Sequence, residues 1–182
     1  NILARLFARR GIHMYAYNAY QSIIRGGHSF LTVRCSDREI RTHGDTIDLI
    51  ICLNQDTMNR HLEHLGPGTS VIFNSDTIEA GEAADGVQFC PMPVGELAGK
   101  SANRLMQNTV AIAVASQLIG IEFSALEDVL KFQFSSKGEE MVAANVEVAR
   151  AAYDHSATNF KPAALQAPQP TTPLAVWAGN QA

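Results

Sequence analysis

A group of side chains that could bind an anion lies early in the chain, at Arg25-Gly26-Gly27-His28-Ser29. Glycine adopts backbone angles closed to other residues and lets another group approach the chain closely. The following segment, residues 29–34, is rich in β-branched and aromatic residues and is predicted to be a strand. A cation, two glycine amides, a histidine and a hydroxyl therefore lie together just before a predicted strand. Such a group of donors can bind a carboxylate or a phosphate.

The same run also has a structural interpretation. It could be a tight turn in which Arg25 is solvated or paired with a nearby acid. Ser29 next to His28 does not make a serine–base pair, because neighbouring side chains in a strand point to opposite faces. The anion site and the plain turn both stay open at this point.

Three further residues, Asn108, His61 and His64, are candidates for a site. Asn108 lies among apolar neighbours in a predicted helix, and a buried asparagine needs hydrogen-bond partners, so it would either fix a loop or line a cleft. His61 and His64 are three residues apart on another predicted helix, but no third ligand lies nearby. A solvated helix face explains the two histidines better than a metal site does.

Composition excludes several classes of function. The net charge of −4 argues against a broad nucleic-acid surface. The longest apolar run, residues 109–121, is too short to span a bilayer, and no basic-then-apolar signal opens the sequence. The three distant cysteines, Cys35, Cys52 and Cys90, form no Cys-x-x-Cys pair, which argues against a disulfide framework or an iron–sulfur cluster here and predicts a cytoplasmic location.

The order of predicted elements indicates an α/β fold. Apolar runs alternate with helical segments in the βαβ rhythm, so we expect a mixed, mostly parallel sheet flanked by helices. Asn54 should cap a helix, and Ser124 with Glu127 should form a capping box. The predicted helices are residues 1–10, 56–65, 101–118, a segment from 124, and 137–153; the predicted strands are residues 12–17, 29–34, 39–42, 47–53, 70–74 and 87–94.

The last part of the sequence changes character. Residues 159–175 are rich in proline, alanine, glutamine and threonine, which predicts an extended linker. Residues 176–182 then regain apolar and glycine residues. We therefore expect three parts: a domain over residues 1–158, a linker over 159–175, and the beginning of a further domain from 176.

An ordered set of motifs resembles one known family. The set comprises Tyr17 and Tyr20, then Arg25-Gly26-Gly27, Ser36-Asp37, the strand with Asp48, Asn108-Thr109-Val110, and residues 137–145. In this order, from residue 1 to about 155, the motifs are similar to the γ-type domain of 2-oxoacid:ferredoxin oxidoreductases, the fold of domain III of pyruvate-ferredoxin oxidoreductase. The tail from Trp177 resembles the opening of the family's α domain, which binds thiamine diphosphate.

This resemblance implies a reaction and its cofactors. Family enzymes convert a 2-oxoacid, coenzyme A and oxidised ferredoxin to acyl-CoA, carbon dioxide and reduced ferredoxin. Thiamine diphosphate with Mg²⁺ supports decarboxylation, and iron–sulfur clusters carry the electrons. The resemblance places these groups on other parts of the complex, so we expect no cofactor on this chain. A fused γ–α arrangement is often that of a 2-oxoglutarate enzyme, with the chain's own α domain, a β subunit and ferredoxin as partners.

The resemblance also implies a site. Arg25, Gly26, Gly27, His28, Ser29 and Asn108 would face the core of the complex or coenzyme A, with no catalytic residue and no metal ligand on this chain. The family's first strand and its Gly-rich turn should precede residue 1, and both are missing. Alternatives are a purely structural interface module, a pyruvate, 2-oxoisovalerate or indolepyruvate member of the family, and a free-standing nucleotide-binding module. The last is disfavoured by the lack of a glycine fingerprint.

Overall fold

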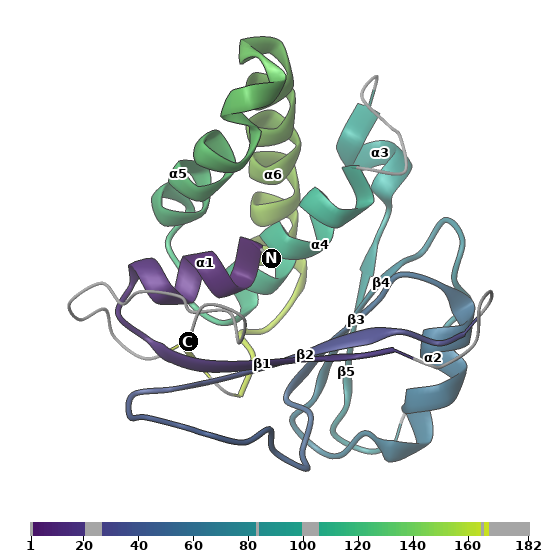
Figure 1. The fold of residues 1–182 in the computed structure, drawn as a ribbon. Coiled ribbons are helices and arrows are strands. Elements are labelled where there is room, and N and C mark those ends of the chain that lie inside the picture. Colours follow the sequence, from purple (N-terminus) through teal and green to yellow (C-terminus); the bar gives the residue numbers. More distant parts are fainter. Residues whose placement is uncertain (1, 21–26, 83, 100–105, 165, 168–182) are drawn as a thin grey trace. The chain divides into compact units, whose positions relative to one another are not determined.

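The structure, a computed structural model, describes residues 2–20, 27–82, 84–99, 106–164 and 166–167. The chain divides into two compact units, residues 1–45 with 167–182 and residues 46–166. The first unit contains α1 (Ile2–Arg9), β1 (His13–Ala19) and β2 (Phe30–Ser36), labelled in Figure 1.

The first unit is built on an antiparallel strand pair. β1 and β2 pair along their whole length, with His13 opposite Ser36 and Ala19 opposite Phe30. This confirms the strands predicted at residues 12–17 and 29–34. α1 is also present as predicted, and Gly11 follows it with a φ of 69°, the left-handed conformation that commonly ends a helix.

One predicted element of this unit is wrong. Residues 39–42 were expected to form a return strand beside β2, but they form no strand. β2 pairs with β1 instead. Three of its four residues are polar and exposed and only Ile40 is apolar and half-buried, so it offers little apolar surface to bury. Arg34 holds it in place by donating from Nη1 to the carbonyl oxygen of Thr42 at 3.3 Å.

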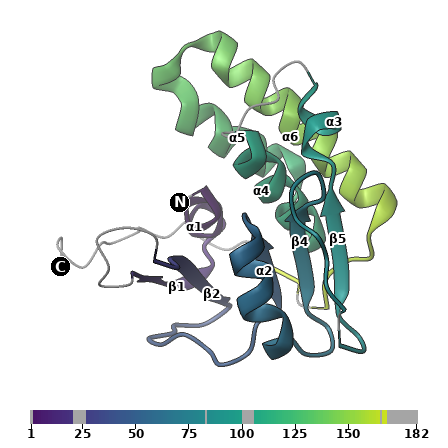
Figure 2. The ribbon, with the colours of Figure 1, turned by 90° about the vertical axis from the view of Figure 1, so that its right-hand side faces the viewer.

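The second unit is an α/β layer structure. Its three strands are parallel and lie in the order β3-β4-β5 (Figures 1 and 2). The elements in chain order are β3 (Leu49–Cys52), α2 (Gln55–His61), η1 (Leu62–His64), β4 (Ser70–Asn74), β5 (Gln88–Met92), α3 (Val94–Ala98), α4 (Met106–Leu118), α5 (Phe123–Phe134), η3 (Ser135–Lys137) and α6 (Glu139–Asn159).

Helices cover both faces of this parallel sheet. α2 lies on one face and α4 with α6 on the other (Figure 1). Every residue of the central strand β4 is buried. Val71 and Phe73 pack with Met58 of α2, and the alternation of a strand turns Ile72 toward the opposite face. The buried strand predicted at residues 70–74 is therefore confirmed, because β4 fills two cores. The apolar run at residues 47–53 was also expected to be buried on both faces, but this is wrong: β3 lies at the edge of the sheet and only Cys52 of it is buried.

The two predicted helix caps have different outcomes. Asn54 caps α2 as expected, since its Oδ1 accepts a 2.8 Å hydrogen bond from the Thr57 amide. The capping box at Ser124 is wrong, because α5 begins one residue earlier, at Phe123, without a side-chain cap. Phe123 is 5% exposed and its ring meets that of Tyr153 edge-on at 5.4 Å, so packing of this ring sets where the helix begins.

Residues 160–164, which follow α6, are hydrogen-bonded to other parts of the second unit. The Gln88 side chain accepts from the Lys161 amide at 3.1 Å and donates to the Lys161 carbonyl at 3.0 Å. The Ala163 amide donates to the Leu118 carbonyl at 2.8 Å, and Ala163 is buried. The first residues of the predicted linker are therefore held by both β5 and α4.

Candidate functional site

The end of the β1–β2 hairpin carries the described part of the predicted anion site. Gly27, His28 and Ser29 immediately precede β2, whereas Arg25 and Gly26 lie outside the described residues. The His28 ring is half-buried and lies 5.6 Å from the ring of Phe30, two residues along the chain. Ser29, which lies between His28 and Phe30 in the sequence, is exposed. In an extended chain its side chain points away from the side that carries the two rings.

Large side chains are exposed at the same end of the hairpin. Tyr20 is 79% exposed and Tyr17 is 46% exposed, and the Tyr17 ring stacks on His43 at 5.7 Å. Phe30 and Leu31 on β2 are also more than 40% exposed, at 42% and 41%. Rings of this kind present an apolar body and, for tyrosine, a polar tip. Such a surface can contact another protein or the rings and methylene groups of a ligand.

Asn108 lies at a different place, in the first turn of α4. It is exposed, so the expectation of a buried asparagine is wrong, and the buried neighbour is Thr109. The adjacent Gln107 donates from Nε2 to the carbonyl oxygen of Leu53 at 3.2 Å, just after β3. The first turn of α4 is therefore joined, through Gln107, to the carboxyl end of β3, the edge at which ligands of parallel sheets commonly bind.

Two helix amides at this carboxyl edge are bound to side chains. Asn54 accepts from the Thr57 amide, and the Asp76 carboxylate accepts from the Gly95 amide of α3 at 2.7 Å. A phosphate would have to displace these partners and would meet the negative charge of Asp76. The arrangement therefore argues against a free-standing nucleotide-binding module in the described part of the chain.

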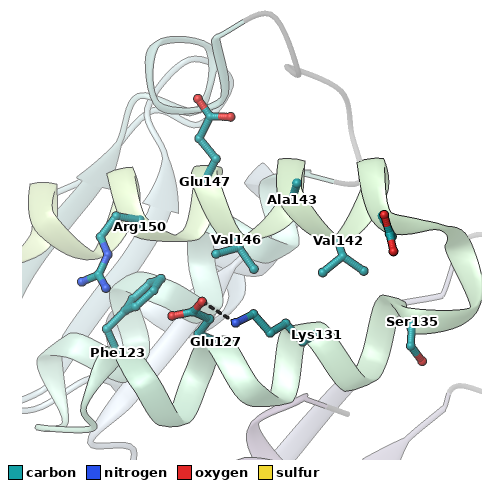
Figure 3. Close-up of a pocket in the computed structure, with 10 residues that line it drawn as sticks. Phe123, Glu127, Lys131, Ser135, Val142, Ala143, Val146, Glu147 and Arg150 are labelled. Atoms are coloured by element: carbon teal, nitrogen blue, oxygen red, sulfur yellow. Dashed lines mark ion pairs between the residues drawn. The ribbon is translucent and has the colours of Figure 1, made fainter.

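A wide groove lies between α5 and α6 (Figure 3). We call it the α5–α6 groove; it has a volume of about 870 Å³. Its lining combines apolar side chains with three carboxylates and two cations. The lining residues are Phe123, Glu127, Lys131, Ser135, Glu139, Val142, Ala143, Val146, Glu147 and Arg150.

Two ordered contacts fix the α5 side of this groove. Lys131 Nζ lies 2.7 Å from Glu127 Oε1, one helical turn away. This contact lowers the pKa of Glu127 and raises the pKa of Lys131, in each case first through the hydrogen bond between them. The guanidinium carbon of Arg150 lies 3.4 Å from the centre of the Phe123 ring. The sequence carried a signal for the first contact in the i, i+4 spacing of opposite charges, but none for the second.

The described residues do not form a metal or cluster site. Among them, no group of three or more histidine, cysteine, aspartate or glutamate side chains comes together. Cys52 and Cys90 lie on β3 and β5, with β4 between them. Burial raises the pKa of Cys52 to about 11 and that of Cys90 to about 12, which disfavours the thiolate that a metal requires. These donors do not fit an iron–sulfur cluster.

The second histidine of the predicted helix lies on an exposed surface. His64 Nε2 lies 3.5 Å from Glu63 Oε1 at the exposed end of η1, in agreement with a solvated face. Within the described ranges, no helix is long and apolar enough to cross a membrane.

The described residues form an α/β domain with a three-stranded parallel sheet and, in the other unit, a β1–β2 hairpin with exposed rings. Residues 1–155 match the family model for pyruvate ferredoxin/flavodoxin oxidoreductase. The chain therefore belongs to the pyruvate ferredoxin/flavodoxin oxidoreductase family. The resemblance inferred from Tyr17 to residue 145 is thus confirmed at the level of the family, and so is the α/β fold with its parallel sheet.

Three known proteins are similar over most of this chain. Ketoisovalerate oxidoreductase subunit VorA of Methanothermobacter thermautotrophicus is 26% identical over 87% of this chain and 33% of its own length. The second is the structure of 2-oxoglutarate:ferredoxin oxidoreductase from Magnetococcus marinus with 2-oxoglutarate, coenzyme A and succinyl-CoA bound. The similarity covers 94% of this chain and 30% of that chain, with 26% sequence identity and a TM-score of 0.85.

A third similarity concerns the fold alone. The gamma subunit of a keto/oxoacid ferredoxin oxidoreductase from Geobacter sulfurreducens is 18% identical, with a TM-score of 0.66, and covers 86% of this chain and 91% of its own. The chain thus spans about a third of VorA and of the 2-oxoglutarate enzyme, but matches nearly the whole of a separate gamma subunit.

Proposed function

We propose that this chain is the γ-type domain of a 2-oxoacid:ferredoxin oxidoreductase complex that acts on 2-oxoglutarate. The complex would convert 2-oxoglutarate, coenzyme A and oxidised ferredoxin to succinyl-CoA, carbon dioxide and reduced ferredoxin. Two electrons leave the substrate as the carbon–carbon bond breaks and the thioester forms. The observation that carries the proposal is the similarity to the 2-oxoglutarate enzyme over 94% of this chain, at a TM-score of 0.85.

Within such a complex, the domain would support assembly and the binding of coenzyme A. Thiamine diphosphate, Mg²⁺ and iron–sulfur clusters would supply the decarboxylation and electron transfer from other parts of the complex. The exposed rings of Tyr17, Tyr20 and Phe30 support a contact role, since exposed aromatic groups are enriched at interfaces. The positive charge of Arg25, with Gly26 and Gly27 beside it, suits the phosphates of coenzyme A.

A 2-oxoisovalerate substrate is the second candidate. It is favoured by the similarity to VorA, a ketoisovalerate oxidoreductase subunit, over 87% of this chain. An assay of the parent complex should therefore compare 2-oxoglutarate with 2-oxoisovalerate, pyruvate and indolepyruvate, each with and without coenzyme A and with a low-potential electron acceptor.

The expected result is acceptor reduction that depends on coenzyme A and is fastest with 2-oxoglutarate. Preference for 2-oxoisovalerate would replace the substrate and keep the reaction class. Failure to reduce the acceptor with any 2-oxoacid would refute the proposed activity and leave a purely structural interface module as the better account.

The role of the hairpin end needs a separate variant. Arg25→Ala should raise the KM for coenzyme A while the complex stays assembled, because the substitution removes a cation next to two glycine amides. Arg38→Ala is the matched control, since Arg38 is an exposed arginine whose Nε lies 3.9 Å from Asp37. Loss of assembly with a normal KM for coenzyme A would favour the interface module instead.

A further inference from the structure

The floor of the α5–α6 groove is apolar and accessible. Val142 and Val146 are half-buried and point from α6 toward α5 in Figure 3. Ala143, also on α6, is exposed and belongs to the lining at its outer edge. Arg150 lies against Phe123 near the other end of the lining. Each valine thus retains exposed surface along the side of α6 that lines the groove.

Both cations that line the groove contact an acid, whereas two of its three carboxylates do not contact a described cation. Lys131 is paired with Glu127, and Arg150 Nη1 lies 4.0 Å from Asp154 Oδ1 in addition to its contact with Phe123. Glu139 and Glu147 form no ion pair with another described residue. They are eight residues apart on α6, a separation of about 12 Å along a helix axis.

We infer that the α5–α6 groove binds an amphipathic helix from another part of the parent oxidoreductase complex. The bound helix would place apolar side chains on Val142 and Val146, and two lysine or arginine side chains about 12 Å apart, opposite Glu139 and Glu147. A helix whose charges complement the groove must be basic, because both groove cations already lie near a carboxylate of this chain, whereas Glu139 and Glu147 have no described cation beside them.

The source of this helix follows from the size of the relatives. The inference shares one assumption with the proposed function, which is that the chain is part of a larger complex. The chain accounts for 33% of VorA and 30% of the 2-oxoglutarate enzyme, so most of such a protein lies outside it. A groove between two helices accepts a third helix readily, since ridges of side chains on one helix fit between those of its neighbours.

A photo-crosslinking experiment on the purified parent complex identifies the occupant. A photoreactive amino acid replaces Ala143, which is exposed and lines the groove, and in a control complex it replaces Ala151, which is exposed on α6 outside the lining. We expect the residue at position 143, but not at 151, to crosslink to one peptide of the complex that carries apolar residues between two basic ones. Equal crosslinking at both positions, a peptide without basic residues, or a link between two copies of α6 would overturn the inference.

Charge reversal tests the two carboxylates. Glu139→Lys and Glu147→Lys together should lower the crosslinking yield from position 143 about tenfold, since each replaces an attraction with a repulsion. Glu140→Lys is the matched control, because Glu140 is exposed in the same first turn of α6 and does not line the groove. An equal yield from the double variant and the control would overturn the inference.

The activity of the unmodified complex separates the two proposals. Acceptor reduction with a 2-oxoacid, without a specific crosslink at position 143, would reject only the groove partner. A specific crosslink to a basic peptide in a complex that turns over no 2-oxoacid would reject the proposed activity and keep the helix in the groove.

Discussion

The hydroxyl of Thr109 on α4 donates a 2.7 Å hydrogen bond to Oδ1 of Asn145 on α6. The two side chains are 3% and 2% exposed, and Asn145 Nδ2 donates to the carbonyl oxygen of Met141 at 2.9 Å. Buried polar groups without partners are costly, so sliding α4 along α6 would lose this hydrogen bond. The pair thereby fixes the register of the two helices that cover one face of the sheet.

Thr109→Val should reduce the free energy of unfolding by about 1–3 kcal/mol, because the variant keeps the shape of the side chain and leaves Asn145 Oδ1 without its donor. Equilibrium unfolding in urea measures the change. Thr158→Val is the matched control, since the Thr158 hydroxyl bonds the Asp154 carbonyl at an exposed site. Equal losses for the two variants would mean that the buried pair contributes nothing specific.

Asn54→Ala should lower the free energy of unfolding by about 1 kcal/mol, the usual value of an N-cap. The substitution removes the acceptor of both the Thr57 amide, at 2.8 Å, and the Thr57 hydroxyl, at 2.9 Å. Asn54→Ser keeps a capping oxygen and should recover most of the loss in the same urea experiment. If serine at position 54 is as unstable as alanine, the amide of Asn54 has a role beyond the cap.

The buried thiols predict a loss of stability at alkaline pH. The pKa is raised from 9.0 to about 11 for Cys52 and to about 12 for Cys90, both by burial. Unfolded thiols lose their protons first, so the stabilising effect is complete below pH 9.0 and disappears as the pH rises toward 11 and 12. Urea midpoints measured from pH 8 to pH 11, about the limit of a reversible experiment, should fall across this window.

The same shift protects the thiols from alkylation. A pKa raised from 9.0 to about 11 leaves about 100-fold less thiolate at pH 8. Cys52 should therefore react far more slowly with iodoacetamide than the half-buried Cys35. Mass spectrometry of the modified peptides gives the rates. Equal rates at Cys35 and Cys52 in the native chain would show that β3 opens readily.

Removing the residues that follow α6 should destabilise the second unit. A chain that ends at residue 160 loses the hydrogen bonds of Lys161 with Gln88 and of Ala163 with Leu118, at about 1 kcal/mol for each bond and roughly 2–3 kcal/mol together. A chain that ends at residue 167 keeps them and serves as the control. Equal urea midpoints for the two chains would show that this segment adds no stability.

Much of the fold could be predicted from local sequence patterns. The apolar run of β4 and the polar residues before α2 predicted a buried parallel strand and a capped helix, because strand burial and capping depend on a few neighbouring residues. The return strand predicted at residues 39–42 was wrong, because β2 pairs with β1 instead. Which strand becomes the partner depends on residues outside the segment, so the sequence of the segment alone cannot predict it.

The candidate sites divide in the same way. The sequence by itself determined the family, through motifs of ordered residue type from Tyr17 to residue 145, and the presence of a cation and glycines at residues 25–27. Only the tertiary structure decided that Thr109 is buried while Asn108 is exposed, because α4 is apolar on nearly all sides and its sequence marks no single face. The α5–α6 groove is likewise tertiary, since it exists only where α5 and α6 lie side by side and leave Val142 and Val146 half-buried.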